Sequence, residues 1–212
     1  MNKLTIIVTY YNAEEYITGC LESIKQQRTQ DFNLIIVNDG STDQSKKLMD
    51  EAIKDYDKNI RFIDLDENSG HAHARNIALE EVETPYFMFL DADDELASYA
   101  ITFYLEKFNN TDGLIAPIHS FTTQRPQFVD LDRVRVEYFN AKENINSFLR
   151  KQSACNIIFR TAIVKAHHIR FNENLNTYVD WSFVLEYMKY VNKFVRIFNF
   201  PFYFRGEVYD PF

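Results

Sequence analysis

Residues 86–94 read Tyr-Phe-Met-Phe-Leu-Asp-Ala-Asp-Asp, an unbroken apolar run that ends in three carboxylates. Three earlier runs have the same form, because each is short, almost wholly apolar and soon followed by polar side chains. They cover Leu4–Val8, Leu34–Val37 and Ile60–Ile63. Continuous apolar runs of this length are typical of strands that are covered on both faces. We therefore predict four buried strands, the last of them over Tyr86–Leu90.

Helical patterns separate these runs. Apolar side chains recur at three- and four-residue spacing in three segments: Ile17, Leu21 and Ile24; Leu48, Met49, Ala52, Ile53 and Tyr56; Ala74, Ile77 and Ala78. Asn12 with Glu15, and Ser41 with Gln44, have capping-box spacing and predict the starts of two helices. This alternation predicts an α/β fold, with a Rossmann-like, mostly parallel central sheet flanked by helices.

The second half of the chain has a less regular pattern. A polar stretch over residues 122–134 precedes a predicted helix over Ala141–Lys151 and a strand-like run over Cys155–Phe159. An amphipathic helix follows, with apolar side chains at Trp181, Val184, Leu185, Met188 and Val191. The aromatic end of the chain favours β-structure, interrupted at Pro201. We expect one α/β domain over residues 1–212, whose C-terminal half builds a wall over the sheet.

Composition limits the classes of function. The chain has 212 residues, of which 46% are hydrophobic, enough for one well-filled domain. A net charge of −8 argues against nucleic acid as a partner, because phosphate binding needs a basic face. Cys20, Cys155, His71 and His73 have neither disulfide-framework nor zinc-ligand spacing. Without a secretory signal or a run of about 20 apolar residues, a cytoplasmic location is expected.

Ligands collect beyond the carboxyl ends of parallel strands, so the polar residues near these ends are the candidate site. They lie in four segments: Thr9–Asn12, Asn38–Asp43, Asn68–Asn76 and Asp91–Asp94. In the last segment, the carboxylates of Asp91, Asp93 and Asp94 repel one another unless a cation lies among them. Oxygen ligands of this kind suit Mg²⁺ or Mn²⁺. The alternative is a solvated acidic turn that caps the next helix.

Two further residues of this rim each have two interpretations. Asp39 could accept a hydrogen bond from the N3–H of a uracil-like base, or it could cap the helix that follows. Because Ser41 and Asp43 suffice for capping, Asp39 is free for a ligand. Arg75 lies early in a predicted helix, where a guanidinium and backbone N–H groups favour a diphosphate. The alternative for Arg75 is an exposed helix arginine.

Four ordered segments resemble the signature segments of the inverting family 2 glycosyltransferases. They read VTYYNAEEYI, IIVNDGSTDQS, ENSGHAHARNIAL and YFMFLDADD, and they cover about Leu4 to Leu96. Looser similarity continues in SACNIIFR, LNTYVDWSFVLEY and FPFYFRGEVYD. The resemblance implies a GT-A fold with a donor half over residues 1–120 and an acceptor half over 121–212. It also implies inverting, Mn²⁺- or Mg²⁺-dependent transfer from a nucleotide-diphosphate sugar, with a UDP-sugar favoured.

The resemblance also implies roles for single residues. The donor-binding residues would be Thr9, Tyr11, Asp39, Asn68, Arg75, Asp91 and Arg205, and the metal ligand would be Asp93. Asp180 would be the general base that deprotonates the acceptor hydroxyl, while the metal stabilises the leaving group. The alternative for Asp180 is a carboxylate that only favours its helix N-terminus. Val179 replaces the acidic residue that usually precedes the base, which puts the acceptor contacts in doubt.

Other departures concern the ends of the pattern. Thr9 stands where proline is commoner, and Gly206-Glu207-Val208 replaces the basic and serine residues that often follow Arg205. The abrupt apolar end indicates an excised domain, similar to the transferase modules fused to polymerases in Gram-positive teichoic acid synthesis. The expected acceptor is a polysaccharide, a teichoic-acid-like polymer or a lipid-linked precursor. Peripheral association with the inner face of the membrane would come through other parts of the longer protein.

Two other functions remain open at this point. A catalytically weak, nucleotide-sugar-binding scaffold of a larger polymer synthase is favoured by Val179. A nucleotidyltransferase would share the α/β layout, but it would be expected to carry a Gly-rich loop with Lys or Arg after the first strand. The segment VTYYNAEEY has no such loop.

Overall fold

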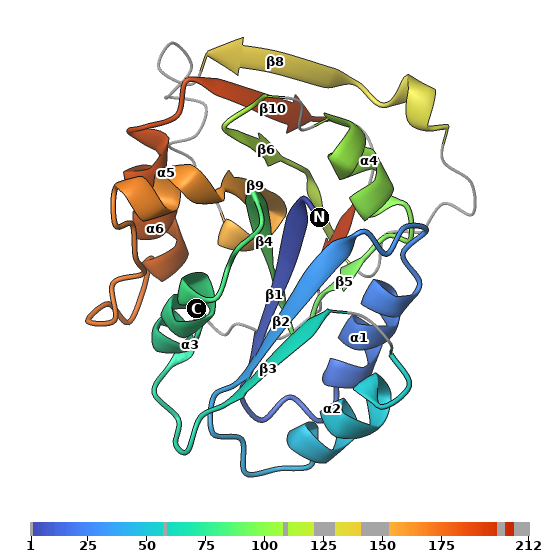
Figure 1. Ribbon diagram of the computed structural model, residues 1–212, viewed down its shortest axis with the longest axis vertical. Helices are drawn as coiled ribbons and strands as arrows, with labels where there is room; N and C mark the ends of the chain where they lie inside the picture. The colour runs from blue at the N-terminus through green and yellow to red at the C-terminus, as the bar shows by residue number, and fades with distance from the viewer. Residues whose placement is uncertain are drawn as a thin grey trace.

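The structure is a computed structural model that describes residues 2–56, 59–107, 110–120, 130–140, 153–198 and 202–205. Its first part alternates strands and helices as predicted (Figure 1). The elements are β1 (Leu4–Tyr10), α1 (Ile17–Lys25), β2 (Phe32–Asn38), α2 (Ser45–Ile53), β3 (Ile60–Asp64), α3 (His71–Glu80) and β4 (Tyr86–Asp91). The helix expected over Ala141–Lys151 and most of the polar stretch before it lie outside the described residues.

The remaining elements are shorter. They are β5 (Glu95–Leu96), α4 (Ala100–Lys107), β6 (Gly113–Ile115), β7 (Ile118–Ser120), η1 (Leu131–Arg133), β8 (Val136–Asn140), η3 (Ala154–Asn156), β9 (Ile157–Arg160), α5 (Thr161–Ala166), α6 (Val179–Met188), β10 (Lys193–Ile197) and β11 (Tyr203–Arg205). None of the helices in the described ranges is long and apolar enough to cross a bilayer.

One large sheet organises the molecule, with strand order β3-β2-β1-β4-β9-β6-β10-β8. The first four strands in this order are parallel, and β9 is antiparallel to both of its neighbours. In this register Thr9 is opposite Asp91, Tyr10 is opposite Asn38, and Asn38 is opposite Asp64. The parallel strands therefore end level with one another, and the polar segments that follow them meet at one rim.

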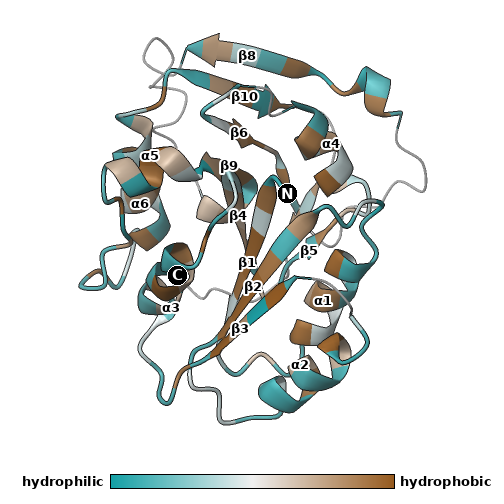
Figure 2. Cartoon of the chain, in the orientation of Figure 1, coloured by the Kyte–Doolittle hydropathy of each residue, from teal (hydrophilic) through white to brown (hydrophobic). Residues whose placement is uncertain are grey.

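The central strands β1, β2 and β4 are mostly hydrophobic, whereas β8, β10 and the helices are mixed (Figure 2). In the view of Figure 1, α1 and α2 lie on one side of the central strands, and α3, α5 and α6 lie on the other. The strands β1 and β2 are almost fully buried, which explains why their sequences show runs rather than alternation. A smaller sheet, β5-β11-β7, adjoins the rim at the turn after β4.

The C-terminal half is built differently from the predicted wall. Strand β9 inserts between β4 and β6, and β10 and β8 extend the same sheet. The predicted wall over the sheet is therefore wrong for these strands, which extend the sheet itself, because short antiparallel strands leave little periodic signal. In α6 the buried side chains are Val179, Phe183, Val184, Tyr187 and Met188. The expected apolar face was partly misplaced, since Trp181 and Leu185 are only half-buried.

The two predicted capping boxes are also wrong. Helix α1 begins at Ile17 and α2 at Ser45, several residues after the expected starts, and neither N-cap residue makes a side-chain cap bond. Instead, the Asn12 side chain accepts a hydrogen bond from the Thr42 amide at 2.8 Å, and the Ser41 hydroxyl accepts one from the Asn12 amide at 3.1 Å. Residues with capping chemistry thus tie together the loops that follow β1 and β2.

Candidate active site

Two adjoining cavities lie at this rim of the sheet. The larger has a volume of about 490 Å³, and its lining includes Arg75, Asp91, Asp93 and Asp180. The smaller has a volume of about 250 Å³, and its lining includes Asp39 and Asn68. Thr9, Tyr10, Tyr11 and His71 line both of them. The segments that follow β1, β2, β3 and β4 therefore form one continuous site, as their common rim predicts.

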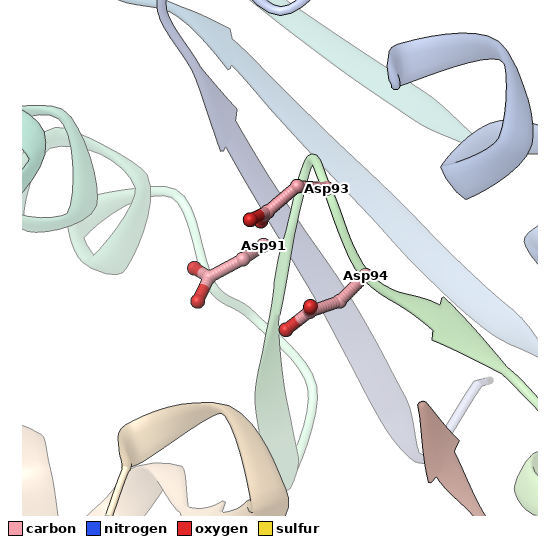
Figure 3. A group of neighbouring side chains, drawn as sticks. All are labelled: Asp91, Asp93 and Asp94. Atoms are coloured by element: carbon pink, nitrogen blue, oxygen red, sulfur yellow. The ribbon is translucent and has the colours of Figure 1, made fainter. Parts of the chain in front are cut away.

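Three carboxylates lie around the turn after β4 (Figure 3). Carboxylate oxygens of Asp91, Asp93 and Asp94 lie within 4.8 Å of one another. Asp94 is buried, and its Oδ2 accepts a hydrogen bond from the Tyr203 hydroxyl at 2.5 Å. The same hydroxyl accepts from the Asp91 amide at 3.3 Å. Tyr203 thus ties both ends of the turn to β11.

Asp93 differs from its two neighbours. Its carboxylate makes no hydrogen bond to any other of the residues that the structure describes, and it lines the larger cavity. Burial and the neighbouring Asp91 carboxylate raise the pKa of Asp93, and the positive charge of Arg205 partly opposes this shift. A carboxylate whose charge is disfavoured in this way is suited to hold a cation, because the cation restores the ionised form.

The Arg75 side chain joins two parts of the site. Its guanidinium is buried, and it donates from Nη1 to Asp180 Oδ1 at 2.5 Å and from Nη2 to Asp91 Oδ1 at 2.6 Å. The Cys155 thiol donates to the other oxygen of Asp91 at 3.0 Å. Phe89 and Phe171 lie beside the guanidinium, with ring centroids at 5.3 and 5.2 Å. Arg75 is therefore not the exposed helix arginine of the alternative interpretation.

Asp180 lies in the first turn of α6, as expected. Its Oδ2 accepts hydrogen bonds from the Ala154 amide at 2.9 Å and the Ser153 hydroxyl at 3.2 Å. Burial alone would raise the pKa of Asp180, but Arg75 and these two hydrogen bonds outweigh it, and the net pKa is lowered. The carboxylate is therefore ionised at neutral pH, which a general base requires.

An aromatic cluster holds the helix that carries Asp180. Phe183 of α6 stacks on Phe171 with ring centroids 4.1 Å apart, and it meets Phe159 of β9 edge to face at 5.3 Å. Phe171 in turn contacts Phe89 of β4 at 5.2 Å. Such pairs contribute about 0.5–1.5 kcal/mol each beyond their buried area. The start of α6 is thus fixed against the strand that ends in Asp91.

Asp39 has structural partners that the sequence did not reveal. Its carboxylate accepts hydrogen bonds from the backbone amides of Ser69 at 2.8 Å and Gly70 at 2.9 Å. Asp39 thus has a structural task other than the helix cap that was its alternative interpretation, and its role toward a ligand stays a prediction. The loop after β2 and the loop before α3 approach each other closely at Gly40, whose φ is +67°. Any other residue at this position would place its Cβ 2.4 Å from the Glu67 carbonyl carbon. Ionised Asp39 still has lone pairs available to a ligand.

Most of the predicted site residues meet in these two cavities. Thr9, Tyr11, Asp39, Asn68, Arg75, Asp91, Asp93 and Asp180 all line them. Arg205 lies at the end of β11 outside the lining, although its charge acts on Asp93. Sequence reasoning missed the contacts of Cys155, Ser153 and Tyr203, because all three are distant in sequence from the carboxylates that they hold.

Comparisons with known proteins agree with this geometry. The profile of glycosyl transferase family 2 matches residues 5–169. An uncharacterized glycosyltransferase of Haemophilus influenzae is 29% identical over 195 residues, which cover 91% of this chain and 74% of that protein. The poly(ribitol-phosphate) beta-N-acetylglucosaminyltransferase TarS of Staphylococcus aureus is 29% identical over 201 residues, which cover 88% of this chain and 32% of TarS.

Solved structures show the same fold. The crystal structure of TarS residues 1–349 superposes with a TM-score of 0.78 at 25% identity, over 96% of this chain and 60% of that one. The complex of the same fragment with UDP-GlcNAc gives a TM-score of 0.80 at 24% identity, over 97% of this chain and 58% of that one. The chain thus spans a third of full-length TarS and about three fifths of the fragment. The predicted GT-A fold is confirmed, and the chain belongs to glycosyl transferase family 2 and is a glycosyltransferase.

Proposed function

We propose that this chain transfers a sugar from a UDP-sugar to a hydroxyl group of a teichoic-acid-type polymer or a related cell-surface glycan, with inversion at the anomeric carbon. The names of two relatives support the acceptor class. TarS is a poly(ribitol-phosphate) transferase, and so is a glucosyltransferase of Bacillus spizizenii that is 34% identical over 115 residues. The UDP-GlcNAc complex of TarS supports the donor class.

One observation carries the proposal. The carboxylates of Asp180, Asp91 and Asp93 line the same cavity of about 490 Å³, and Asp180 lies on an element far from the other two in the sequence. An inverting transferase needs a base on the acceptor side of the anomeric carbon and charge stabilisation on the leaving-group side. A cavity that held only a base, or only an acidic turn, would supply only one of these two requirements.

The charges of the larger cavity favour a divalent cation. Its lining holds the carboxylates of Asp91, Asp93 and Asp180, and among the described residues of this lining Arg75 alone carries an opposing positive charge. Burial and the charge of Arg75 lower the pKa of His71, so this histidine adds no positive charge at neutral pH. A nucleotide diphosphate would be repelled by such a lining unless a cation accompanied it. The oxygen ligands fit Mn²⁺ or Mg²⁺, which commonly bind one or two carboxylates together with substrate phosphates.

The residues that would hold this cation are Asp93 and one oxygen of Asp91. When bound, the cation supplies Lewis-acid stabilisation of the leaving diphosphate. Asp94 is a poorer ligand, because its carboxylate is buried and bonded to Tyr203.

Asp180 performs the other half of the reaction. It takes the proton of the acceptor hydroxyl as that oxygen forms a bond to C1 of the sugar, and the bond from C1 to the diphosphate oxygen breaks on the opposite face. An ionised carboxylate has about four lone-pair positions, and three hydrogen bonds to Arg75, Ser153 and Ala154 leave one for the acceptor. These three bonds also fix the orientation of the carboxylate.

We further propose roles for the donor-binding residues and for the two halves of the chain. Thr9, Tyr11, Asp39 and Asn68 line the smaller cavity and would bind the uracil and ribose. Residues 1–120 would bind the donor and residues 121–212 the acceptor, within a longer protein of which this chain is one module. That protein would act in the cytoplasm, with peripheral attachment to the inner membrane face through its other parts.

The test is a thermal-shift panel of uridine, guanosine and cytidine diphosphates and their sugars, with and without Mn²⁺. The largest shift is expected for a UDP-sugar with Mn²⁺, and release of UDP on addition of poly(ribitol-phosphate) then identifies transfer. A preference for GDP would contradict the assignment of Asp39. Tight binding of donors without hydrolysis or transfer of any of them would favour the scaffold, whose specific support is Val179.

A further inference from the structure

Arg75 is deeply buried in the site, with 5% of its side chain exposed. Both terminal nitrogens of its guanidinium have a carboxylate partner, Asp180 on one side and Asp91 on the other. Nη2 also contacts the Cys155 sulfur at 3.6 Å. To reach a diphosphate in the cavity, this guanidinium would have to leave two ion pairs in which its own charge is buried and the carboxylates are half-buried. Truncating one partner of such a pair is strongly destabilising, because the other charge stays buried alone.

The two carboxylates come from opposite sides of the proposed reaction. Asp91 ends β4, next to the turn that carries Asp93, whereas Asp180 begins α6 and is the proposed base. A planar guanidinium holds two carboxylates at a fixed separation and angle, which a lysine cannot do. Phe89 and Phe171 pack beside the Arg75 guanidinium and limit its movement.

The geometry points to Arg75 as a positioning residue that holds the base Asp180 in a fixed relation to Asp91, and not as a ligand of the donor diphosphate. This inference rests on the proposed function, since it takes Asp180 as the base. The other oxygen of Asp180, Oδ2, is held separately by Ser153 and Ala154. Loss of Arg75 would therefore leave the carboxylate free to rotate about these two hydrogen bonds. Donor binding would be affected far less than turnover.

The test compares UDP affinity with turnover in Arg75→Lys, which keeps the positive charge but loses the planar guanidinium that bonds both carboxylates. UDP affinity is measured by calorimetry with Mn²⁺, and turnover is measured as hydrolysis of the donor at saturating concentration. We expect the Kd of UDP to change by less than about threefold and turnover to fall by about 10²-fold, as for a misplaced catalytic group. Arg160→Lys is the matched control, because Arg160 pairs with Asp112 at 3.0 Å outside the cavity, and it should change neither quantity.

A double-mutant cycle with Asp180→Asn separates positioning from an independent role. If Arg75 acts through Asp180, the double variant should turn over no more slowly than Asp180→Asn alone, within about twofold. The inference is overturned if the two losses multiply, or if Arg75→Lys weakens UDP binding more than about tenfold while saturated turnover is retained. Should Arg75→Lys fail to fold, Arg75→Gln carries the same measurements. A wild-type chain that hydrolyses no donor would contradict the proposed function instead, and that outcome is seen before any variant is made.

Discussion

Replacing Asp39 should separate the two tasks that the structure gives this side chain. Asp39 is 2% exposed, and its carboxylate accepts hydrogen bonds from the amides of Ser69 and Gly70. The Gly70 amide also donates to Asn68 Oδ1 at 3.0 Å, so in Asp39→Ala the Ser69 amide loses its acceptor whereas the Gly70 amide keeps one. A hydrogen bond to a charged group contributes about 1.5–3 kcal/mol, and we expect a stability loss of about 2–3 kcal/mol.

Asp39→Asn is the sharper substitution for ligand binding. Asn keeps one acceptor oxygen for the loop, so the expected stability loss is smaller, at about 1–2 kcal/mol. Its amide nitrogen offers a donor where the proposed contact to N3–H of uracil needs an acceptor. UDP binding should therefore weaken by about 1–3 kcal/mol, which is roughly a 5- to 150-fold rise in Kd.

The assay pairs urea unfolding with calorimetric titration of UDP in the presence of Mn²⁺. Asp43→Asn is the matched control, because Asp43 also follows β2 and holds its loop through the Ser45 amide at 2.9 Å, but it lines neither cavity. The control should lose stability and retain UDP affinity. The reasoning is refuted if Asp39→Asn unfolds earlier but binds UDP like the wild type. Equal losses of UDP affinity in both variants would also refute it, since the effect would then come from the loop alone.

Three other substitutions test the rest of the site. Gly40→Ala places a Cβ 2.4 Å from the Glu67 carbonyl carbon at a residue with positive φ, so it should lower both Tm and UDP affinity. Unchanged UDP affinity in calorimetry would contradict the tight contact between these loops. Asp93→Asn should abolish the enhancement of UDP binding by Mn²⁺ with little change in Tm. Asp94→Asn should lower Tm, because it weakens the buried hydrogen bond from the Tyr203 hydroxyl, and it should retain most of the Mn²⁺ enhancement. Asp180→Asn should reduce turnover by about 10²–10⁴-fold at nearly constant UDP affinity, and near-wild-type donor hydrolysis would place the base elsewhere.

The parts of the fold that could be predicted from the sequence are those in which local pattern and burial agree. Strands β1, β2 and β4 are buried on both faces, and their continuous apolar runs predict this burial. Strand β9 has only four residues, and its place between β4 and β6 depends on antiparallel pairing with segments that are distant in sequence, such as Tyr86 with Arg160 and Ile115 with Ile157. No periodicity in a single short segment encodes such a pairing.

The candidate site shows the same division. The membership of Asp39, Arg75 and Asp93 in one rim follows from the strand ends alone, because parallel strands in register end together. The bonding partners of these residues could not be predicted, since a carboxylate after a strand has the same sequence signature whether it holds a loop, a guanidinium or a ligand. Asp39 illustrates this, because its loop contacts to Ser69 and Gly70 lie thirty residues ahead.

The three aspartates after β4 are chemically identical, and side chains from outside their own turn give them different properties. Asp91 is held by Arg75 and Cys155, and Asp94 by Tyr203, whereas Asp93 lines the cavity without such a bond among the residues described. Two of these partners come from β11 and the η3 turn before β9, in the C-terminal half of the chain. The N-terminal half alone would keep the contact between Arg75 and Asp91, but it would lose the contacts of Cys155 and Tyr203 that further distinguish the three carboxylates. It follows that the proposed metal site and the proposed base depend on the same packing of β9 against β4, so a substitution that loosens this contact should impair both together.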